Sequence, residues 1–435
     1  MEWHVFLTVV FVALVALMFT GLPIAFCFMG VCFLTAFLLM GPFGISQLVL
    51  GMYDQVCNFT LTPIPFFMIM GEVFYQSGII SRTLDTLSKL VKKVPGRLSV
   101  ITLLGGGIFA ALSGSVVANT AMFGSLMLPE MVKRGYNKSL IAGSIMASGA
   151  LAMIIPPSSL AVLLGSIANI SVGRILIGAV VPGILLMLLY IAYVIGSCIM
   201  YPAHAPAYEV EDTKGRELAK AVLVDIIPLF FIFFLVTGLI FMGVATPTEA
   251  AALGALGAYV LTAFYRKFSF KLLIGTLVSS LNVTASILLI IAGSAGFSQI
   301  LAISGASRRA VLAIMGFSSN PWVLVITMLA IVFVLGFFME QTAIMMITLP
   351  IFMPIIIAMK TNQVWFAVMY LICLQIGQLT PPVGLALFTL KSVSPPEVTM
   401  KDIYKGAWPY VIADILAVIL IMLFPILATW LPGKI

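Results

Sequence analysis

Long apolar runs joined by short polar connections make up almost the whole chain. A membrane-crossing helix needs about 20 apolar residues, whereas a transmembrane barrel strand alternates over about ten. Eight runs suit single helices: 4–20, 21–41, 61–80, 172–200, 221–242, 246–265, 281–299 and 403–430. Three mixed or amphipathic segments are predicted to lie at the membrane interface: 44–58, 82–97 and 268–279. The pattern therefore predicts an all-α polytopic membrane protein with about ten transmembrane segments.

Four further apolar stretches are interrupted in the middle by glycine, proline or polar residues. They are 98–134 (at Gly105-Gly106-Gly107 and Ser113-Gly114-Ser115), 139–168 (at Pro156-Pro157), 321–360 (at Glu340-Gln341-Thr342) and 363–392 (at Pro381-Pro382). Where the backbone is irregular at membrane depth, its N–H and C=O groups must find hydrogen-bond partners in the protein or line a water-filled cavity. These interruptions are therefore candidate functional positions.

The interruptions recur at a fixed spacing, which indicates an internal repeat. Pro129 and Pro156-Pro157 recur as Pro354 and Pro381-Pro382, at one common offset in the numbering. The pattern continues with Gly178-Ala179 and Pro182 against Gly406-Ala407 and Pro409, at offsets that are only slightly larger. At the offset of the prolines, the polar tip 113–115 falls on 338–340. Paired, Gly/Pro-interrupted segments in two halves point to a transporter binding site.

The positive charges predict that the two repeats are inverted. Segment 98–134 is flanked by Lys92, Lys93 and Arg97 on one side and by Lys133, Arg134 and Lys138 on the other. Both ends should then be cytoplasmic, so this segment enters and returns as a re-entrant hairpin. Counting crossings from there places 17 of the 22 Lys and Arg inside. Segment 321–360 has nearly neutral flanks and should enter from outside, with both chain termini outside.

Composition narrows the class of protein. Hydrophobic residues make up 62% of the 435 residues and charged residues only 9%, whereas soluble domains carry about 25% charged residues. The net charge of +7 matters only through where the positive residues fall. Five cysteines in apolar stretches form no CxxC pair, and two distant histidines provide no metal site. The first run, 4–20, lacks a basic leader and a cleavage site and is expected to be a retained helix.

Each half offers oxygen-rich residues at a hairpin tip and at a proline break. In half one they are Ser113, Gly114, Ser115, Asn119 and Thr120 at the tip, and Ile155 to Ser159 at the break. In half two they are Glu340, Gln341 and Thr342 at the tip, and Thr380 to Gly384 at the break. Prolines leave carbonyls free, and such hard oxygen ligands suit an alkali cation such as Na⁺. Half-helix N-termini at the same points suit an anionic substrate.

Three carboxylates lie within apolar segments. Glu340, in the middle of a hairpin, is predicted to be functional because a carboxylate in lipid is costly unless it is paired or wet. Capping of a helix start within the tip remains the alternative. Glu249 follows Thr246-Pro247-Thr248, a sequence typical of an N-cap, so a structural role is favoured. The role of Glu72 stays open.

Other function classes find little support in the sequence. No Walker lysine motif, Gly-x-Ser-x-Gly elbow or His-Glu-x-x-His helix is present. An intramembrane enzyme would need a nucleophile and a base at depth, and no histidine lies there. A channel would need a continuous polar pore, whereas the polar groups here cluster at the tips and breaks. No catalytic residue is therefore predicted.

Several motifs resemble one known family over nearly the whole chain. They are the 108–120 hairpin stretch, 153–159, 245–251 (ATPTEAA), 336–342 and 379–385 (LTPPVGL). Together they resemble the large membrane subunit of TRAP (tripartite ATP-independent periplasmic) transporters. This chain has Glu340 and Gln341 where the family commonly has Asp followed by Thr.

The resemblance implies Na⁺-coupled uptake of a small organic acid anion by an elevator mechanism, in a bacterial inner membrane with both termini periplasmic. It implies two protein partners, a periplasmic substrate-binding protein and a small four-helix membrane subunit. A stand-alone Na⁺-coupled carrier is the alternative. The expected ion ligands are Ser113, Gly114, Ser115, Asn119, Pro156, Ser158, Glu340, Thr342, Thr380 and Pro381. The expected substrate-binding residues are Ser115, Asn119, Ser159, Glu340, Gln341 and Gly384.

An elevator-type fold further implies a division of the chain into scaffold and transport parts. Residues 1–60 would form scaffold helices and an interfacial arm, and 61–200 the first transport repeat with hairpin 98–134. Residues 201–280 would form the inter-repeat connection and further scaffold helices. Residues 281–435 would form the second transport repeat, with hairpin 321–360 and the final helix.

Overall fold

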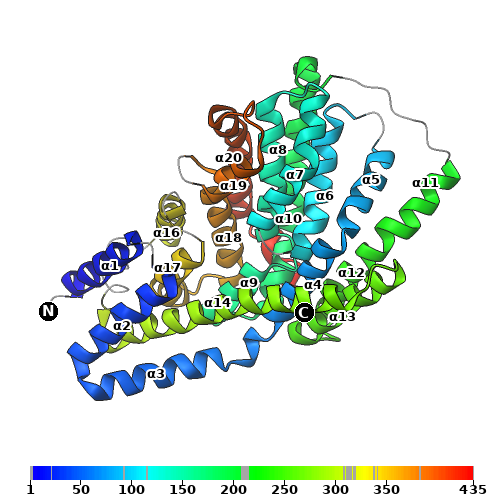
Figure 1. Cartoon of the computed structure of the whole chain (residues 1–435). Coiled ribbons are helices and arrows are strands. Elements are labelled where there is room, and N and C mark those ends of the chain that lie inside the picture. Colours follow the sequence, from blue (N-terminus) through cyan, green and yellow to red (C-terminus); the bar gives the residue numbers. More distant parts are fainter. Residues whose placement is uncertain are drawn as a thin grey trace.

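The computed structural model describes residues 3–434 apart from 21, 92–93, 114–115, 207–214, 307–308, 310–315, 317–319, 337–338, 340 and 382–383. Every regular element in the described residues is helical (Figure 1). The first half contains α1 (Trp3–Phe19), α2 (Ile24–Met40), α3 (Pro42–Val56), η1 (Phe59–Leu61), α4 (Pro63–Ser77), α5 (Ile79–Leu90), α6 (Arg97–Ser113), α7 (Val116–Lys133), α8 (Lys138–Ala150), η2 (Leu151–Met153), α9 (Ser159–Ala168), α10 (Val172–Met200) and η3 (Pro202–His204).

The second half begins with a connection and then follows the order of the first. It contains α11 (Gly215–Ala221), the π-helix η4 (Val222–Ile226), α12 (Ile227–Phe241), α13 (Pro247–Phe264), α14 (Phe270–Ile303), α16 (Pro321–Gly336), α17 (Gln341–Ala358), α18 (Gln363–Leu379), α19 (Leu385–Val393), α20 (Met400–Leu423), α21 (Ile426–Thr429) and η5 (Pro432–Lys434). The predicted all-α class is confirmed for the part of the chain that the structure describes.

The predicted repeat is visible in the helix boundaries. Helix α7 runs from 116 to 133 and α17 from 341 to 358, so both ends are separated by the same offset as the prolines. Helices α8 and α18 also begin at this offset from each other, each behind an asparagine N-cap. Asn137 accepts hydrogen bonds from the amides of Ser139 and Leu140, and Asn362 accepts one from the amide of Trp365. The same cap therefore begins the broken helix in each half.

One pair of equivalent segments differs between the halves. At the repeat offset, α14 corresponds to α3 and α4, which are bent by 49° at the 57–62 connection. Helix α14 is instead continuous over 34 residues (Figure 1). The prediction of an interfacial piece at 268–279 and a separate span at 281–299 is therefore wrong: no proline interrupts 270–303, and its glycines are accommodated within one helix. The span predicted to begin at 221 also starts earlier, at α11.

The two halves pack into each other at their centre. Helix α7 of the first hairpin lies against α19, and α17 of the second hairpin lies against α9. Helices α8 and α20 approach so closely that a Cβ on Gly143 would lie 2.3 Å from the carbonyl oxygen of Gly406. Small residues allow such close backbone packing between membrane helices. Both hairpins are thus held by broken helices from the opposite half.

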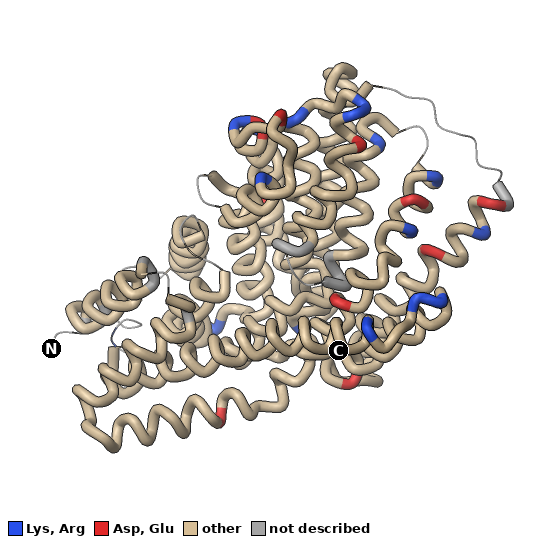
Figure 2. Tube along the Cα trace, in the orientation of Figure 1, with Lys and Arg blue, Asp and Glu red and all other residues tan. Residues whose placement is uncertain are grey.

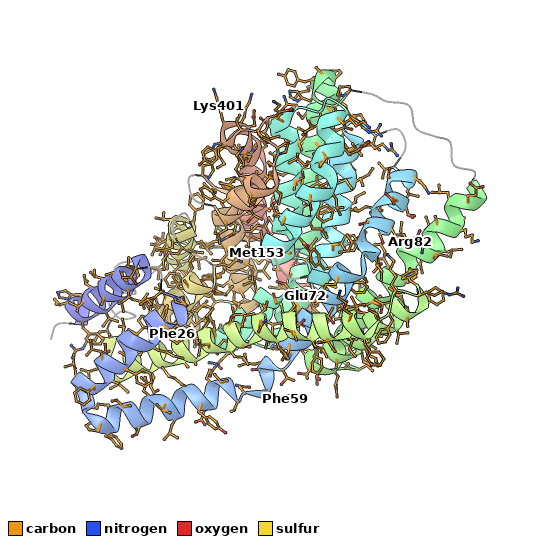
Figure 3. All side chains as sticks on the ribbon, in the orientation of Figure 1. Phe26, Phe59, Glu72, Arg82, Met153 and Lys401 are labelled. Carbon is orange, nitrogen blue, oxygen red and sulfur yellow. The ribbon has the colours of Figure 1, made fainter. Side chains whose placement is uncertain are left out.

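The chain connections gather in two sets, as the predicted topology requires. In one set, the amide of Asn137 donates to the carbonyl oxygen of His204 (2.8 Å), and the Lys138 ammonium donates to that of Glu397 (2.7 Å). In the other, the 58–63, 165–173 and 246–248 segments line one cavity. Lys401 and Phe59, from the two sets, lie at opposite ends in Figure 3, with Met153 between them. Which set faces the cytoplasm stays a prediction.

Charge follows the same division. In Figure 2, most Lys and Arg lie along the upper end of the helices and around α5 and α11, and few lie at the lower left. In the described residues, five helices are long and apolar enough to cross a membrane, or six if the bent α3–α4 pair is one span. Seven shorter apolar helices accompany them. The predicted total of about ten crossings includes some of these shorter helices and stays a prediction.

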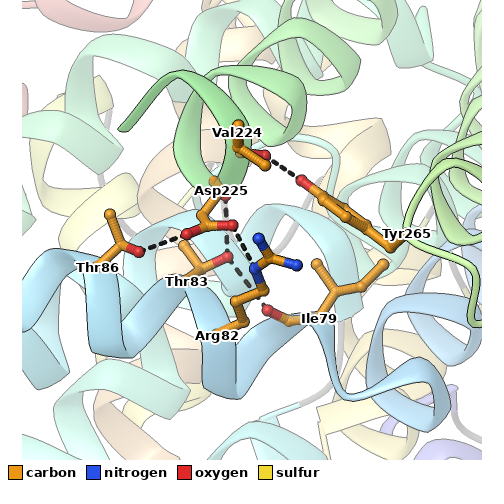
Figure 4. A network of polar contacts seen from close by, with 7 residues as sticks. All are labelled: Ile79, Arg82, Thr83, Thr86, Val224, Asp225 and Tyr265. Atoms are coloured by element: carbon orange, nitrogen blue, oxygen red, sulfur yellow. Dashed lines mark hydrogen bonds and ion pairs between the residues drawn. The ribbon is translucent and has the colours of Figure 1, made fainter. Parts of the chain in front are cut away.

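A partly buried ion pair ties the segment before the first hairpin to the inter-repeat connection (Figure 4). Arg82 Nε lies 2.5 Å from Asp225 Oδ1, and the Thr86 hydroxyl donates to Asp225 Oδ2 over 2.7 Å. The Arg82 guanidinium also covers the Tyr265 ring, 5.1 Å from its centroid. The Tyr265 hydroxyl donates to the carbonyl oxygen of Val224. These contacts join α5, η4 and the end of α13.

Candidate functional site

In the first half, the hairpin lies directly against the proline break. Helices α6 and α7 both contact η2, the turn that precedes the break. A Cβ on Gly106 would lie 2.3 Å from the Ser148 Cβ, and one on Gly107 would lie 3.4 Å from the Ile155 side chain. The Gly105-Gly106-Gly107 run therefore serves close packing of α6 on the broken helix, which brings the predicted tip and break together.

The break consists of two prolines followed by a serine that caps the next helix. The Pro156–Pro157 peptide bond is cis. Ser158 is fully buried, and its hydroxyl donates to the carbonyl oxygen of Met153 (2.7 Å) and accepts from the amide of Ala161 (3.3 Å). Ser158 is thus the N-cap of α9, and Ser159 is the first residue of that helix. The role of Ser158 as an ion ligand stays a prediction.

A buried hydroxyl oxygen lies between the hairpin and the broken helix. Thr120 on α7 is fully buried, and its Oγ1 has no hydrogen-bond partner among the residues that the structure describes. The same atom would lie 2.1 Å from a Cβ on Gly149 of α8, so α8 carries no side chain at that contact. Asn119 precedes Thr120 and is also buried. Predicted tip residues on α7 therefore face α8 just before η2.

The second half repeats this arrangement with a contact between two glycines. A Cβ on Gly377 of α18 would lie 2.6 Å from the Gly336 Cα, so the end of α16 touches the backbone of the broken helix. The Thr380 hydroxyl donates to the carbonyl oxygen of Ile376 (2.6 Å) at the break. Gly384 begins α19 without a side-chain cap, and its backbone approaches the carbonyl oxygen of Gln378. The second hairpin and break are therefore also neighbours.

Two amide oxygens in this half also find no donor among the described residues. Gln378 is buried, and its Oε1 has no hydrogen-bond partner in that part of the chain. Gln341 is the first residue of α17, and its Oε1 is likewise buried without a described partner. Thr342 follows it and is buried. Buried acceptors without donors are costly, and a cation with hard oxygen ligands would satisfy them. The chemistry of the described residues in both halves thus fits a bound Na⁺.

Some predicted residues lie outside the described part of the chain. They are Gly114, Ser115 and Glu340, with Pro382 and Val383 at the second break. Ser113 ends α6, and its side chain is likewise outside that part. Pro156 and Pro381 both lie at the breaks, as predicted. The metal and substrate roles assigned to all these positions stay predictions.

The two other membrane carboxylates have local partners. Glu249 completes a capping box with Thr246: its Oε2 accepts from the Thr246 amide (2.8 Å), and its amide donates to the Thr246 hydroxyl (3.3 Å). The predicted structural role of Glu249 is confirmed. Glu72 accepts a hydrogen bond from Gln76 (2.8 Å) one helical turn later. A third carboxyl, Asp414 on α20, is absent from the predicted set, although its position within an apolar run is the signal that singles out Glu340.

An arginine missed from sequence lies near the α9–α10 turn. Arg174, in the first turn of α10, lines a cavity of about 370 Å³ with Asn169, Ser171 and the 361–364 segment. It is exposed, and the described residues offer it no ion-pair partner. A positive side chain is unfavourable at a helix N-terminus unless an anion is near. A positive residue in the first turn of a predicted helix is therefore the sequence signal that could have identified Arg174 as a candidate anion-binding residue.

Fold and site together define a polytopic helical membrane protein built from two hairpin-containing repeats, the architecture of secondary transporters. Among solved structures, the YdaH transporter of Alcanivorax borkumensis has a similar fold, with a TM-score of 0.66 at 16% identity over 91% of this chain and 90% of that chain.

Sequence comparison identifies the family. The profile of "Tripartite ATP-independent periplasmic transporter, DctM component" matches residues 11–427, and the chain belongs to this family. A C4-dicarboxylate TRAP transporter large permease protein DctM of Rhodobacter capsulatus is 28% identical over 443 residues, 98% of each chain. A sialic acid TRAP transporter large permease protein SiaM of Vibrio cholerae is 29% identical over 419 residues, 96% of each chain. The predicted resemblance is confirmed.

Proposed function

We propose that this chain is the large membrane subunit of a Na⁺-coupled importer of small organic acid anions. It works in a bacterial inner membrane with both termini in the periplasm. A periplasmic binding protein delivers the substrate, a small membrane subunit completes the carrier, and the transport part moves as an elevator. Relatives named for C4-dicarboxylate and sialic acid support the substrate class.

The observation that carries the proposal is the duplicated pairing of hairpin and break, with buried oxygen atoms in each half that have no hydrogen-bond partner among the described residues. Thr120 provides one such oxygen in the first half, and Gln341 and Gln378 provide two in the second. A sodium ion at each break would complete these acceptors, and its binding would couple ion entry to movement of the hairpin.

The coupling is tested by uptake into proteoliposomes that contain the chain and its small subunit. A thermal-shift screen of acids against the binding protein first identifies the labelled substrate. Uptake should require an inward Na⁺ gradient and added binding protein. Uptake that persists with K⁺ in place of Na⁺ would refute the coupling. Full Na⁺-driven uptake without the binding protein would favour the stand-alone carrier.

The inverted arrangement is tested with one position in each repeat. Lys133 and Ala358 end α7 and α17, occupy equivalent positions at the repeat offset and are exposed. In a Cys57→Ser background, which removes the exposed native thiol, an impermeant maleimide should label Ala358→Cys from outside and Lys133→Cys only after permeabilisation. Labelling of both from the same side would contradict the topology.

An anionic substrate also gives Arg174 a role at the predicted outer end. Because Arg174 lines a polar cavity near the α9–α10 turn, Arg174→Gln should raise the substrate KM with little change in the half-saturating Na⁺ concentration. Lys360→Gln is the matched control, since it removes an exposed positive charge from the neighbouring α17–α18 connection. If both substitutions raised the substrate KM equally, the effect would come from surface charge in general, and the proposed role of Arg174 would be wrong.

A further inference from the structure

A fully buried carboxyl lies where three helices, α10, α18 and α20, meet. Asp414 on α20 has no exposed surface. Its Oδ1 accepts from the Tyr190 hydroxyl on α10 and from Gln375 Nε2 on α18, the latter over 3.0 Å. Gln375 Nε2 also donates to the Tyr190 oxygen over 2.7 Å. One carboxyl oxygen therefore receives both donors of the cluster.

The other half of the cluster contains acceptors only. Asp414 Oδ2 and Gln375 Oε1 are both buried and have no hydrogen-bond partner in the described part of the chain. An ionised carboxylate can only accept, so it would leave both oxygens unsatisfied, together with its charge. A proton on Oδ2 removes the charge and turns one of the two lone acceptors into a donor. The hydrogen-bond pattern therefore favours the protonated form of the Asp414 carboxyl.

No positive side chain compensates the carboxyl in the part of the chain that the structure describes. The helices packed against α20 are α8, α10, α18, α19 and α21. The titratable groups that they and α20 place around the cluster are neutral: Tyr190, Tyr193, Cys198, Tyr370, Cys373 and Tyr410. The described residues give Asp414 no ion pair.

The lysines of the helices packed against α20 have other partners, and those of α20 itself, Lys401 and Lys405, lie at least nine residues before Asp414, about 13 Å along a helix. Lys138 starts α8 and donates to the carbonyl oxygen of Glu397, and Lys391 near the end of α19 donates to that of Val398. Arg174 lies more than four helical turns before Tyr190 on α10, which is about 24 Å along a helix. An isolated carboxylate in such surroundings carries a large desolvation cost, and the group takes up a proton instead.

We propose that Asp414 is a proton-binding site of this protein, in which a neutral carboxylic acid is held by Tyr190 and Gln375 between the two repeats. The proton comes from the aqueous phase and returns to it. Helix α10 ends the first repeat, and α18 and α20 belong to the second, so loss of the proton would leave a buried charge at the junction of the halves. Alkaline pH would therefore act on the transporter at this position.

Infrared spectroscopy tests the protonation state directly and needs no transport. At pH 7, the difference spectrum between wild type and Asp414→Asn should contain a carboxylic acid C=O band from the wild type, which shifts with ¹³C-labelled aspartate. Loss of carboxylate bands in its place would overturn the proposal. Because Asn has nearly the same shape as the neutral acid, Asp414→Asn should also keep its melting temperature and Na⁺-driven uptake at neutral pH.

A second pair of variants serves if Asp414→Asn fails to fold. Tyr190→Phe removes a donor to Oδ1 and should shift the acid band, whereas Tyr410→Phe removes a hydroxyl that has no partner among the described residues and should leave the band unchanged. Absence of any acid band sensitive to Tyr190→Phe would contradict the proposal. A sodium ion at Asp414 is the rival occupant. It predicts a loss of Na⁺ affinity in Asp414→Asn, by about ten- to a hundred-fold, and that result would also overturn the proton site.

Discussion

The two proline breaks have the same position in their repeats but are built from different chemistry. In the first, Ser158 caps the following helix, and the hairpin contacts the broken helix through Gly106 and the Ser148 side chain. In the second, Gly384 leaves α19 without a side-chain cap, and Gly336 meets Gly377 backbone to backbone. The bounds of α7 and α17 are therefore equivalent in the two halves, while the polar groups at the breaks and the residues in contact have diverged. Two ion sites built this way should differ in affinity.

The strongest test of that difference removes one oxygen ligand from each half. Asn119→Ala should weaken the first site and Thr380→Val the second, each by about 1–3 kcal/mol or about ten- to a hundred-fold in Na⁺ affinity. Each single variant should still transport at high Na⁺, while the double variant should be nearly inactive at physiological Na⁺. The measurement is a Na⁺ titration of uptake, normalised to folded protein.

The rival explanation is that these side chains only pack helices. It predicts lower expression or a lower melting temperature, with unchanged Na⁺ dependence in the protein that survives. An unshifted Na⁺ curve in both single variants would end the two-site interpretation. A shift in only one of them would place the ion site in that half alone.

The contact between two glycines in the second half should tolerate little added volume. A methyl group at Gly377 would lie 2.6 Å from the Gly336 Cα, and because its neighbour is backbone, the helices themselves must separate. Gly377→Ala should destabilise by about 1–3 kcal/mol or more. At the equivalent position of the repeat, the first half carries Ala152. Ala152→Gly should cost about 0.5–1 kcal/mol.

Melting temperatures measured in detergent should be lower for Gly377→Ala than for Ala152→Gly. A Gly377→Ala variant as stable as Ala152→Gly would show that the α16–α18 contact relaxes freely. Uptake adds a second readout, because separation of α16 from α18 would displace the second hairpin from its break. The Na⁺ dependence of Gly377→Ala should therefore shift, whereas that of Ala152→Gly should stay close to wild type.

Sequence patterns predicted most of the fold because its main determinants are local or periodic. Apolar run length predicts the helices, and the Pro156 and Pro381 spacing predicts the repeat. Other features depend on neighbours that are remote in sequence. The continuity of α14 across 279–281 and the pairing of Arg82 with Asp225 could not be predicted from local patterns. Asp414 could have been found from its place in an apolar run, but its lack of a cationic partner among the described residues is visible only in the structure.

The cap at the first break should have a smaller effect than the glycine contact. Ser158→Ala removes the acceptor for the Ala161 amide at the start of α9, and loss of such a cap costs about 1 kcal/mol. If Ser158 also binds the ion, the half-saturating Na⁺ concentration should rise as well. Ser158→Thr keeps the hydroxyl and is the matched control. Lower stability with an unchanged Na⁺ curve would assign Ser158 to capping alone.

The asparagine N-caps of the two broken helices occur at equivalent positions in both halves. Asn137→Ala and Asn362→Ala each remove the N-cap of a broken helix, and each should destabilise by about 1 kcal/mol. Asn137 accepts two backbone hydrogen bonds and Asn362 one, so the first substitution should cost slightly more. The two caps lie in different sets of connections, one near His204 and the other near Arg174. Their effects on the free energy of unfolding should therefore add to within about 0.5 kcal/mol in the double variant. Reversible unfolding in mixed detergent micelles measures the free energy of unfolding of the wild type, the two single variants and the double variant. A larger coupling would mean that the two broken helices fold as one unit, and that the repeats depend on each other even at their outer ends.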